Sequence, residues 1–387
     1  MSQTSTADVV VIGLGAVGSA TLHRLARSGV RAIGVDRFHP PHDKGSSHGE
    51  TRITRVAIAE GQEYVPLARR SHEIWRELEA ETGESLFHQI GLLIIAEGDQ
   101  GPSHGKASFI RSQIEVADAN AVPYEMLDSA EIHRRYPQFL LRGPERAYFE
   151  PGGGVLEVEK CVAVQLQLAQ ALGATVRTGE TVRSIEPSGS GVAVTTDKGR
   201  IEAGRAVLTA GSWLPGLAGD AVRKHTTVHR QVVLWFRPNE PRLYEPASCP
   251  PFIWFQGAGE EDYLYGFPLL GGTAGVKAAT ERYPGHVEPD AVDRVVTEAE
   301  AQAVYDRHVA GYLRGVTRTL VKASTCLYTV SPDAGFIVDR LQDGRVLAAS
   351  ACSGHGFKHS PALGERLAIA ATQSGALEPA FALSRFG

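Results

Sequence analysis

Residues 9–36, VVVIGLGAVGSATLHRLARSGVRAIGVD, contain the pattern that decides the fold. The apolar run from Asp8 to Ile12 predicts a strand that is buried on both faces of a parallel sheet. Gly13, Gly15 and Gly18 follow as G-x-G-x-x-G, which suits a tight turn, close approach to a pyrophosphate and close packing of helix on strand. This order predicts the first strand and phosphate-binding turn of a dinucleotide-binding unit.

The second half of the stretch completes this unit. A helix is expected from Ala16 to Ser28, with Gly29 as its C-cap, and a second strand from Val30 to Val35. Asp36 ends that strand and is placed to accept hydrogen bonds from a ribose diol, so it favours an unphosphorylated ribose although Arg37 follows it. Both NAD and FAD fit this pattern, and the remaining sequence has to separate them.

Composition excludes several classes of partner. The 387 residues are 43% apolar and 21% charged, with a net charge of −5 and no basic stripe, which argues against nucleic acid. The N-terminal MSQTSTAD has neither the basic nor the apolar region of a signal peptide, and no run approaches the roughly 18 apolar residues of a membrane span. We therefore expect a cytoplasmic protein with no membrane association.

The cysteines give no sign of a metal centre. Cys161, Cys249, Cys326 and Cys352 stand far apart, without a C-x-x-C pair. This spacing predicts free thiols and no metal site. The ordinary interpretation of each is a small, buried apolar side chain.

The segment after the second strand is unusual for a nicotinamide enzyme. Residues 40–75 read PPHDKGSSHGETRITRVAIAEGQEYVPLARRSHEIW and carry Arg52 and Arg55 three positions apart. On a helix or a tight turn this spacing puts both guanidinium groups on one side. The pair is therefore either a solvated face or an anion site close to the dinucleotide turn.

Six stretches together resemble one family. They are PPHDKGSSHGETRITR (40–55), EYVPLARRSHEIW (63–75), VLTAGSW (207–213), YLYGFP (263–268), TCLYTVSPDAGFIVD (325–339) and SGHGFKHSPALGE (353–365). These stretches are similar to those of the monomeric sarcosine oxidase and N-methyltryptophan oxidase family, FAD-dependent amine oxidases within the D-amino-acid-oxidase-like group. The resemblance runs from residue 8 to the closing LSRFG, and it favours FAD over NAD.

The resemblance implies how FAD is bound. It places a thioether between Cys326 and the 8α-methyl group of the flavin, and Cys352 is the other cysteine expected near the ring. A second strand, glycine turn and helix around residues 353–358 would point N–H donors at the pyrimidine edge of the flavin. The expected cofactor-binding residues are Gly13, Gly15, Gly18, Asp36, Arg37, Ser46, Thr51, Gly211, Cys326, Gly354, Gly356, Phe357 and Lys358.

The resemblance also implies roles in substrate binding and catalysis. Arg55 and Lys358 would clamp a substrate carboxylate, because a guanidinium fork and an ammonium both suit that anion. His48 and Arg52 would lie against the flavin ring, and Tyr265 and Tyr328 would line the substrate cavity. Lys277 matches the lysine that contacts the flavin through water and assists its reaction with O2. By spacing alone, each would be an ordinary packed or solvated side chain.

Two departures from the family bear on specificity. Glu281 stands where the sarcosine and methyltryptophan oxidases carry an active-site histidine, and Ser46-Ser47-His48 replaces a loop with two adjacent histidines. A carboxylate at position 281, which we include among the catalytic candidates, would change the charge of the cavity and would either attract a cationic substrate or favour a different amine. Sarcosine itself is therefore not the expected substrate.

The sequence predicts an FAD-dependent oxidase of a secondary amino acid, N-methyl or cyclic. Hydride would pass from the C–H next to nitrogen to flavin N5, the imine would hydrolyse, and O2 would be reduced to H2O2. One alternative is a flavin-dependent amine dehydrogenase that passes electrons to a quinone or a carrier protein, and another is an oxidase of a glycated or other amino acid. A nicotinamide-dependent dehydrogenase is disfavoured by the C-terminal motifs. A non-catalytic or RNA-modification role is disfavoured by the net negative charge of the chain.

The expected fold is α/β, with a Rossmann-like FAD-binding domain interwoven with a mixed-sheet substrate domain of α+β character. Residues 1–85, 150–215 and 325–387 would form the first domain, and residues 86–149 and 216–324 the second. A helical stretch is expected near Asp290 to Arg307. The expected partners are a small amino acid and O2, and a monomer is favoured over an oligomer.

Overall fold

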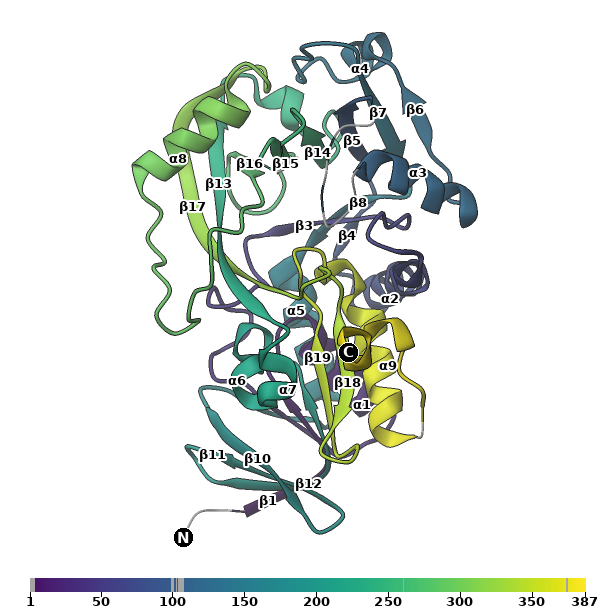
Figure 1. Ribbon diagram of the computed structural model, residues 1–387, viewed down its shortest axis with the longest axis vertical. Coiled ribbons are helices and arrows are strands. Elements are labelled where there is room, and N and C mark those ends of the chain that lie inside the picture. Colours follow the sequence, from purple (N-terminus) through teal and green to yellow (C-terminus); the bar gives the residue numbers. More distant parts are fainter. Residues whose placement is uncertain (1–3, 99–100, 102, 104–107, 260, 374) are drawn as a thin grey trace.

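Two large sheets lie at opposite ends of an elongated molecule, and a small sheet lies between them (Figure 1). The computed structural model describes residues 4–98, 101, 103, 108–259, 261–373 and 375–387. Each large sheet has eight strands and the small one has three. The strands of each large sheet come from segments that alternate along the chain.

The lower sheet in Figure 1 is built around β1, the strand predicted from the opening apolar run. β1 lies between β12 and β2, and both pairs are parallel, as are β2 with β9 and β12 with β19. Antiparallel strands extend the sheet beyond β12: β11 and β10 on one branch, and β18 next to β19 on the other. Its members are β10 (Val182–Ser188), β11 (Gly191–Thr196), β12 (Arg200–Leu208), β1 (Thr4–Ile12), β2 (Ala32–Val35), β9 (Thr175–Arg177), β18 (Ile337–Leu341) and β19 (Val346–Ser350).

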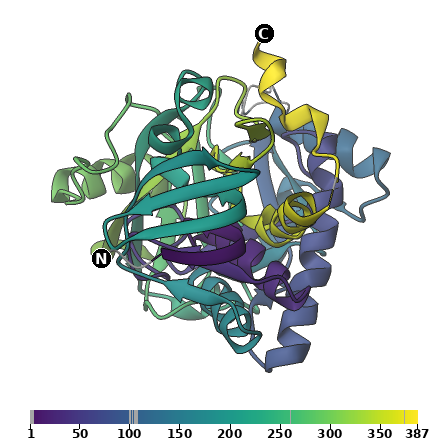
Figure 2. The same cartoon turned by 90° about the horizontal axis from the view of Figure 1, so that it is seen from below.

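The two faces of this sheet are covered differently. Val9 and Val11 pack against helices, whereas Val10 and Ile12 face β10, β11 and two short helices. Because both faces are buried, the strand has to be apolar at every position from residue 9 to 12. The helices on the first face are α1 (Ala16–Arg27), α2 (Val65–Thr82), α5 (Val158–Ala171) and α9 (Ser360–Thr372), and those near the second are α6 (Leu214–Ala218) and α7 (Asp220–Arg223). Figure 2 shows this layer of helices beside the sheet.

The predicted strand–turn–helix–strand unit is present, but the helix ends and the second strand begins at other residues than expected. α1 buries Leu22 and Leu25 and has Ser28 as its C-cap, while Gly29 is the following residue, in the left-handed region at φ 72°. The second strand begins at Ala32 rather than Val30, because Val30 still donates its backbone N–H to the carbonyl oxygen of Leu25 in the helix. Full burial of each leucine contributes about 1.5–3 kcal/mol, so the apolar stripe of α1 holds it on the sheet.

The upper sheet is mixed. All of its neighbouring strands pair antiparallel except β14 with β5, which are parallel. In spatial order its strands are β17 (Val316–Val330), β13 (Thr227–Pro238), β16 (Val276–Ala279), β15 (Tyr263–Phe267), β14 (Phe252–Phe255), β5 (Leu92–Glu97), β7 (Glu145–Glu150) and β6 (Glu125–Leu127). The helices α3 (Phe109–Ala119), α4 (Ser129–Arg135) and α8 (Glu298–Val304) belong to this half of the molecule.

The prediction of a helix over residues 290–307 is wrong for the first half of this range. α8 begins at Glu298, where Thr297 and Glu300 form a capping box, and it continues as a π-helical turn, Tyr305–Val309. Asp290 accepts hydrogen bonds from Arg37 and Trp213 instead. These tertiary contacts hold Asp290 in a turn against Arg37 and Trp213, and the helix starts only after its cap at Thr297.

The small sheet shows that the predicted helix or tight turn at Arg52 and Arg55 is wrong. It consists of β3 (Thr51–Thr54), β8 (Gly154–Glu157) and β4 (Phe87–His88). Arg52 therefore lies in a strand, and Arg55 directly follows it, rather than both lying on a helix or tight turn. Successive side chains of a strand point to opposite faces, so the two guanidinium groups have different surroundings.

The chain crosses between the two halves several times. The order of the sheets along the sequence resembles the expected alternation, and the exact domain bounds stay a prediction. Among the described residues, no helix is long and apolar enough to cross a membrane. Nor do the described residues contain a group of three or more His, Cys, Asp or Glu side chains arranged to hold a metal ion.

Candidate active site

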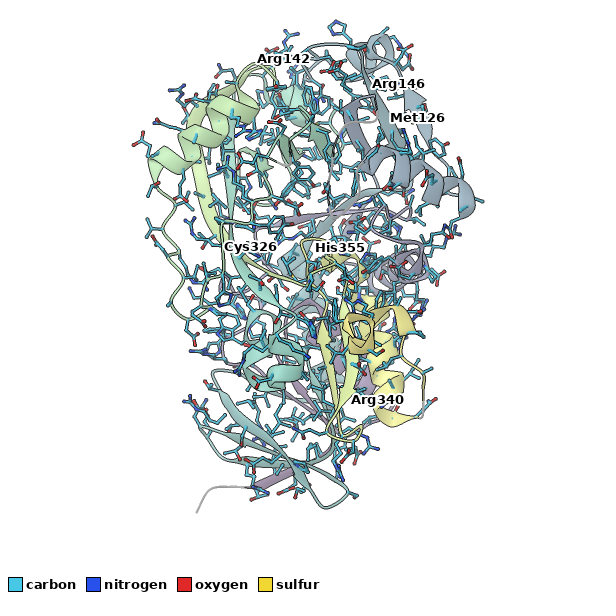
Figure 3. The ribbon with its side chains drawn as sticks, viewed as in Figure 1. Met126, Arg142, Arg146, Cys326, Arg340 and His355 are labelled. Carbon is cyan, nitrogen blue, oxygen red and sulfur yellow. The ribbon has the colours of Figure 1, made fainter. Side chains whose placement is uncertain are left out.

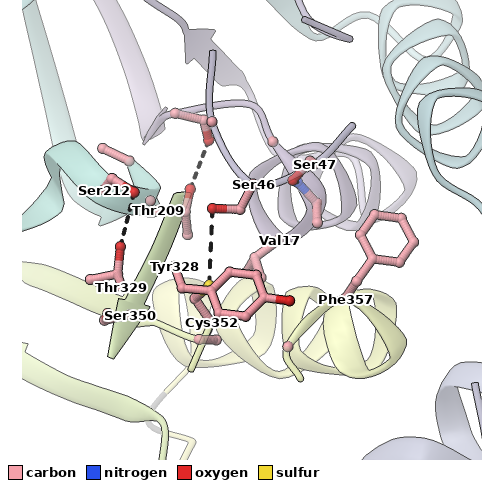
Figure 4. Close-up of a pocket in the computed structure, with 18 of the residues that line it drawn as sticks. Val17, Ser46, Ser47, Thr209, Ser212, Tyr328, Thr329, Ser350, Cys352 and Phe357 are labelled. Atoms are coloured by element: carbon pink, nitrogen blue, oxygen red, sulfur yellow. Dashed lines mark hydrogen bonds between the residues drawn. The ribbon is translucent and has the colours of Figure 1, made fainter. Parts of the chain in front are cut away.

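One cavity of about 470 Å³ joins the dinucleotide turn to the upper sheet. Most of the residues singled out from sequence line it: Gly13, Gly15, Asp36, Arg37, Ser46, Arg52, Arg55, Gly211, Tyr265, Glu281, Tyr328, Gly354, Gly356, Phe357 and Lys358. The remaining ones, Gly18, His48, Thr51, Lys277 and Cys326, are not part of its lining. Figure 4 shows part of the wall, with Tyr328, Phe357 and the contact of Ser46 with Cys352.

The glycine turn has no room for side chains. A Cβ atom on Gly13 would lie 2.6 Å from the Cα of Ala210, and one on Gly18 would lie 1.8 Å from the carbonyl oxygen of Gly13. Gly13 also has a φ of +88°, which an L side chain rarely adopts. The turn therefore keeps β1 and α1 in contact and lets a ligand backbone approach, and the N-terminus of α1 faces the cavity as an anion site.

Asp36 is buried at the same end of the cavity. Its two carboxylate oxygens accept the backbone N–H groups of Leu14 and Phe38, both at 2.7 Å. A carboxylate oxygen has further lone pairs, so Asp36 can still accept hydrogen bonds from a ribose diol. Arg37 forms an ion pair with Asp290, at 2.6 Å, which turns its charge towards the segment before α8.

Cys326 and Arg52 are in contact, with Arg52 in the lining of the cavity and Cys326 outside that lining. Cys326 Sγ is 3.8 Å from Nη2 of Arg52 and 3.8 Å from the carbonyl oxygen of Ser46. Burial raises the pKa of the Cys326 thiol, while the Arg52 charge opposes that shift. In Figure 3, Cys326 lies at the level between the two large sheets. Cys352, by contrast, lines the cavity, with its Sγ 3.9 Å from Oγ of Ser46.

Lys277 is buried and held by one turn of backbone. Its Nζ donates to the carbonyl oxygens of Gly49 and Thr51, both at 2.7 Å, and to Oγ1 of Thr51 at 3.1 Å. An ammonium has three hydrogens, and these three acceptors engage them all. Burial lowers the pKa of Lys277, and the nearby Arg52 lowers it further. These bonds hold the Lys277 side chain in one position, and its contact with the flavin through water stays a prediction.

Glu159, which was not among the predicted site residues, binds the backbone turn of residues 49–51 from the side opposite Lys277. Gly49 and Glu50 donate their backbone N–H groups to its carboxylate, at 2.7 and 3.0 Å. Both residues have a left-handed φ, +89° and +71°, so the carbonyls of residues 49 and 51 turn towards Lys277. Nothing in the sequence pattern around Glu159, in the first turn of α5, marks it for this role.

His48 is a packed side chain in this structure. It is buried, and its Nε2 lies 3.1 Å from the carbonyl oxygen of Gly45. Burial, with a further contribution from Arg52, lowers its pKa to about 3, so the imidazole is neutral at physiological pH. A role for His48 against the flavin stays a prediction.

Arg55 and Lys358, the two cations of the expected clamp, lie beside the same acid, Glu60. This acid was not among the site residues predicted from the sequence. Nη2 of Arg55 donates to both carboxylate oxygens of Glu60, at 3.0 and 2.8 Å, and Nζ of Lys358 lies 3.6 Å from Glu60. All three side chains are about 95% buried or more. Burial lowers the pKa of Lys358 to about 7, although Glu60 opposes the shift. Arg55 and Lys358 therefore converge on one carboxylate, here supplied by the protein itself.

Aromatic rings form the walls beyond the clamp. The hydroxyl groups of Tyr265 and Tyr328 lie 3.4 Å apart, and Tyr263 and Phe109 extend the lining. Burial raises the pKa of Tyr265 to about 12, so its phenol stays protonated. Glu281 joins this part of the wall directly after β16. The cavity thus combines a dinucleotide turn, a carboxylate clamp and an aromatic wall.

A glycine cradle for pyrophosphate, a buried acid for ribose and a carboxylate clamp in one cavity define a dinucleotide-dependent oxidoreductase that acts on an amino acid or a similar anion. The glycine turn and the continuous cavity fit FAD. The chain belongs to the FAD dependent oxidoreductase family, which it matches over residues 8–369. This confirms the enzyme class and the FAD-binding fold expected from the sequence.

The relatives in this comparison are named as oxidases. The chain is 37% identical to monomeric sarcosine oxidase of Streptomyces avermitilis, over 94% of this chain and 93% of the relative. It is 33% identical to N-methyl-L-tryptophan oxidase of Yersinia pestis, over 98% and 99% of the two chains. The structure of NikD, an unusual amino acid oxidase essential for nikkomycin biosynthesis, matches with a TM-score of 0.82 and 25% identity, over 97% and 96% of the chains. These likenesses confirm the family resemblance.

Proposed function

We propose that this protein is an FAD-dependent oxidase of a secondary amino acid, N-methyl or cyclic, with O2 as electron acceptor and H2O2 as product. The observation that carries the proposal is the convergence of Arg55 and Lys358 on one carboxylate, inside the cavity that begins at the dinucleotide turn. The names of the relatives, sarcosine oxidase and N-methyl-L-tryptophan oxidase, support an N-alkyl amine as the reacting group.

The clamp binds and orients the substrate. In place of Glu60, the substrate carboxylate takes the guanidinium of Arg55 and the ammonium of Lys358, and this anchors the α-carbon in the aromatic part of the cavity. Tyr265 and Tyr328 remain neutral and present their hydroxyl groups and ring faces to the amine. Bound FAD would supply the acceptor for the hydride from the C–H next to nitrogen and the means of passing the electrons to O2.

The cofactor is attached through Cys326 in this proposal. The thiolate is the reactive form of cysteine, and Arg52, 3.8 Å from Sγ, favours it against the opposing effect of burial. Arg52 is itself held by the carbonyl oxygens of Ser46 and Thr51, both at 2.8 Å. Cys352 lines the cavity and its Sγ lies 3.9 Å from the hydroxyl oxygen of Ser46, so it is the control rather than the attachment site.

Reaction with O2 relies on fixed positive charge. Lys277 and Arg52 share an acceptor on one side of the cavity, and a cation there stabilises the negative charge that develops on O2. A dehydrogenase that uses a quinone or a carrier protein would have no need of this arrangement. We further propose that the protein acts as a cytoplasmic monomer, as the sequence predicts.

The test is a substrate panel with the FAD-loaded protein. N-methyl, cyclic, primary and glycated amino acids are mixed with the enzyme in air, and both flavin reduction and peroxide are measured. We expect reduction and stoichiometric peroxide with N-methyl or cyclic amino acids, and none with their methyl esters. Flavin reduction without peroxide would instead identify a dehydrogenase, and exclusive oxidation of primary or glycated amino acids would overturn the substrate class.

A further inference from the structure

A fully buried acid, Glu150, is bonded to the residue that follows Arg55 of the clamp. Glu150 ends β7 and is not part of the cavity lining. Its Oε1 accepts the backbone N–H of Val56 at 2.6 Å, and its Oε2 accepts the hydroxyl of Tyr148 at 2.9 Å. Burial of a carboxylate is costly unless hydrogen bonds compensate it, so the groups that Glu150 binds indicate what it holds in place.

The segment that Glu150 binds has no regular structure of its own. Residues 55–61, directly after β3, lie in neither a helix nor a strand. Buried backbone groups in such a segment need hydrogen-bond partners from elsewhere. Glu150 takes the N–H of Val56, and Nε2 of Gln113 donates to the carbonyl oxygen of Ala57 at 2.8 Å. Nε2 of Gln113 also lies 3.5 Å from Oε2 of Glu150, so these two side chains together hold the two residues after the clamp arginine.

The clamp is assembled from both halves of the molecule. Burial raises the pKa of Glu150, whereas its hydrogen bonds and the nearby Arg55 charge oppose the rise. Phe109, one turn before Gln113 on α3, covers the guanidinium, with Cζ of Arg55 5.5 Å from the centre of its ring. Arg55 therefore leaves the small sheet and is held by β7 and α3 of the upper half (Figure 1). Lys358, by contrast, lies just before α9 in the nucleotide-binding half.

We propose that Glu150, together with Gln113, is a positioning residue for substrate binding. By holding residues 56 and 57, the two side chains set the direction in which Arg55 leaves β3 and keep its guanidinium aligned with the substrate carboxylate. This inference rests on the proposed function, in which Arg55 binds that carboxylate. A guanidinium fork has to meet a carboxylate in one plane, so a small displacement of Arg55 weakens binding. Glu150 lies outside the cavity lining and acts on the substrate only through Arg55.

The first test compares a carboxylate with its ester. The FAD-loaded protein is titrated anaerobically with pentanoate and with methyl pentanoate, and the change in flavin absorbance gives both Kd values. Glu150→Ala should raise the Kd of pentanoate by about tenfold, the equivalent of one hydrogen bond between charged groups that is no longer aligned, and leave the Kd of the ester unchanged. Glu150→Gln keeps an oxygen for the N–H of Val56, and its Kd for pentanoate should stay within about threefold of the parent value.

Glu145→Ala is the matched control. Glu145 lies at the other end of β7, is buried, and likewise accepts backbone N–H groups, those of Arg142 and Gly143 at 2.8 and 2.6 Å. It is not part of the cavity lining, so this variant should bind pentanoate like the parent. Unchanged pentanoate binding in Glu150→Ala, an equal loss for acid and ester, or an equal loss in Glu145→Ala would overturn the proposal. A Glu150→Gln protein that binds pentanoate as weakly as Glu150→Ala would also overturn it.

The second test does not depend on the folding of Glu150→Ala. Gln113→Leu removes the donor to the carbonyl of Ala57 and leaves Glu150 in place. With an N-methyl amino acid that the parent oxidises, KM should rise by roughly threefold to tenfold, while the limiting rate of anaerobic flavin reduction stays within about twofold, because only binding of the carboxylate is impaired. An unchanged KM, or a fall in the limiting rate as large as the rise in KM, overturns the inference and leaves the proposed function standing. Failure of the parent protein to bind pentanoate and to oxidise any N-alkyl amino acid overturns the two together.

Discussion

Lys277 and Arg52 donate to the same oxygen atom, the carbonyl of Thr51, at 2.7 and 2.8 Å. Two cations, the buried Lys277 and the half-buried Arg52, are thereby placed side by side at the strand that borders the cavity, and one backbone carbonyl sets their relative position. The Thr51 carbonyl cannot move without displacing both charges. The arrangement concentrates positive charge where the proposed reaction with O2 needs it.

Replacing Lys277 by Met should slow the reoxidation of reduced flavin by O2 by roughly two to three orders of magnitude, because removal of one preorganised charge loses about 3–4 kcal/mol of stabilisation. Anaerobic reduction by substrate should change much less, and stopped-flow absorbance follows both steps. Lys322→Met is the matched control, since Lys322 lies over the same Trp235 ring, at 4.9 Å, but is 43% exposed. Parent-like reoxidation in Lys277→Met would assign the role to another cation.

Glu159→Gln should move the pH dependence of reoxidation. The Glu159 carboxylate raises the pKa of Lys277 against the larger lowering by burial and Arg52, so its removal lowers that pKa further. Lys277 acts as a cation and loses its proton as pH rises, and the fall in rate should therefore begin at a lower pH in the variant. Rates measured between pH 6 and 10 test this. A purely structural role would lower the rate at every pH and leave the midpoint unchanged.

Cys326→Ala should release the flavin. In the parent protein, acid precipitation should leave the yellow colour in the protein pellet, and in the variant it should pass to the supernatant. Cys352→Ala is the control, because this thiol also lines the cavity, with its Sγ 3.9 Å from the hydroxyl oxygen of Ser46, and it should behave like the parent. Flavin in the supernatant of the parent protein would show that Cys326 is a packed thiol and not the attachment site.

Lys358→Met should raise the apparent Kd of the substrate carboxylate by at least about a hundredfold, because loss of one partner of a buried, hydrogen-bonded charge pair costs several kcal/mol. Flavin absorbance under anaerobic titration gives the Kd. The corresponding methyl ester should bind equally weakly to the parent and the variant. Equal binding of the free acid to both proteins would contradict the clamp.

Glu60→Gln should tighten the binding of pentanoate at pH 6, because the ligand no longer competes with an internal carboxylate for Arg55 and Lys358. Lys358 has a pKa lowered to about 7 by burial and supported by Glu60. Binding needs its protonated form, so affinity falls as pH rises through that value, and the fall should begin at lower pH in the variant. Calorimetry from pH 5.5 to 8.5 checks both effects. Weaker binding at every pH would show that Glu60 supports the clamp rather than competing for it.

Several parts of the fold and site followed from the sequence because their signals are local. The G-x-G-x-x-G turn, α1 and Asp36 occur within 28 consecutive residues, and backbone periodicity and glycine geometry specify them. The strand character of residues 51–54 was missed, because three-residue spacing of arginines suits several structures and only pairing with β8 selects one. Likewise, the contact of Asp290 with Arg37 joins residues 253 positions apart and shortens the predicted helix.

By itself the sequence determined the enzyme class and its cofactor, since the dinucleotide turn and the family stretches are read along the chain. Only the tertiary structure decided the electrostatics of the site. Lys277 meets the carbonyl of Gly49 across 228 positions, and Glu159 holds the same turn from α5. Glu60 reaches Lys358, near the other end of the chain, and Arg55 with it. Charges interact through distance and local dielectric rather than through sequence order, so their pairing exists only once the sheets have brought these segments together.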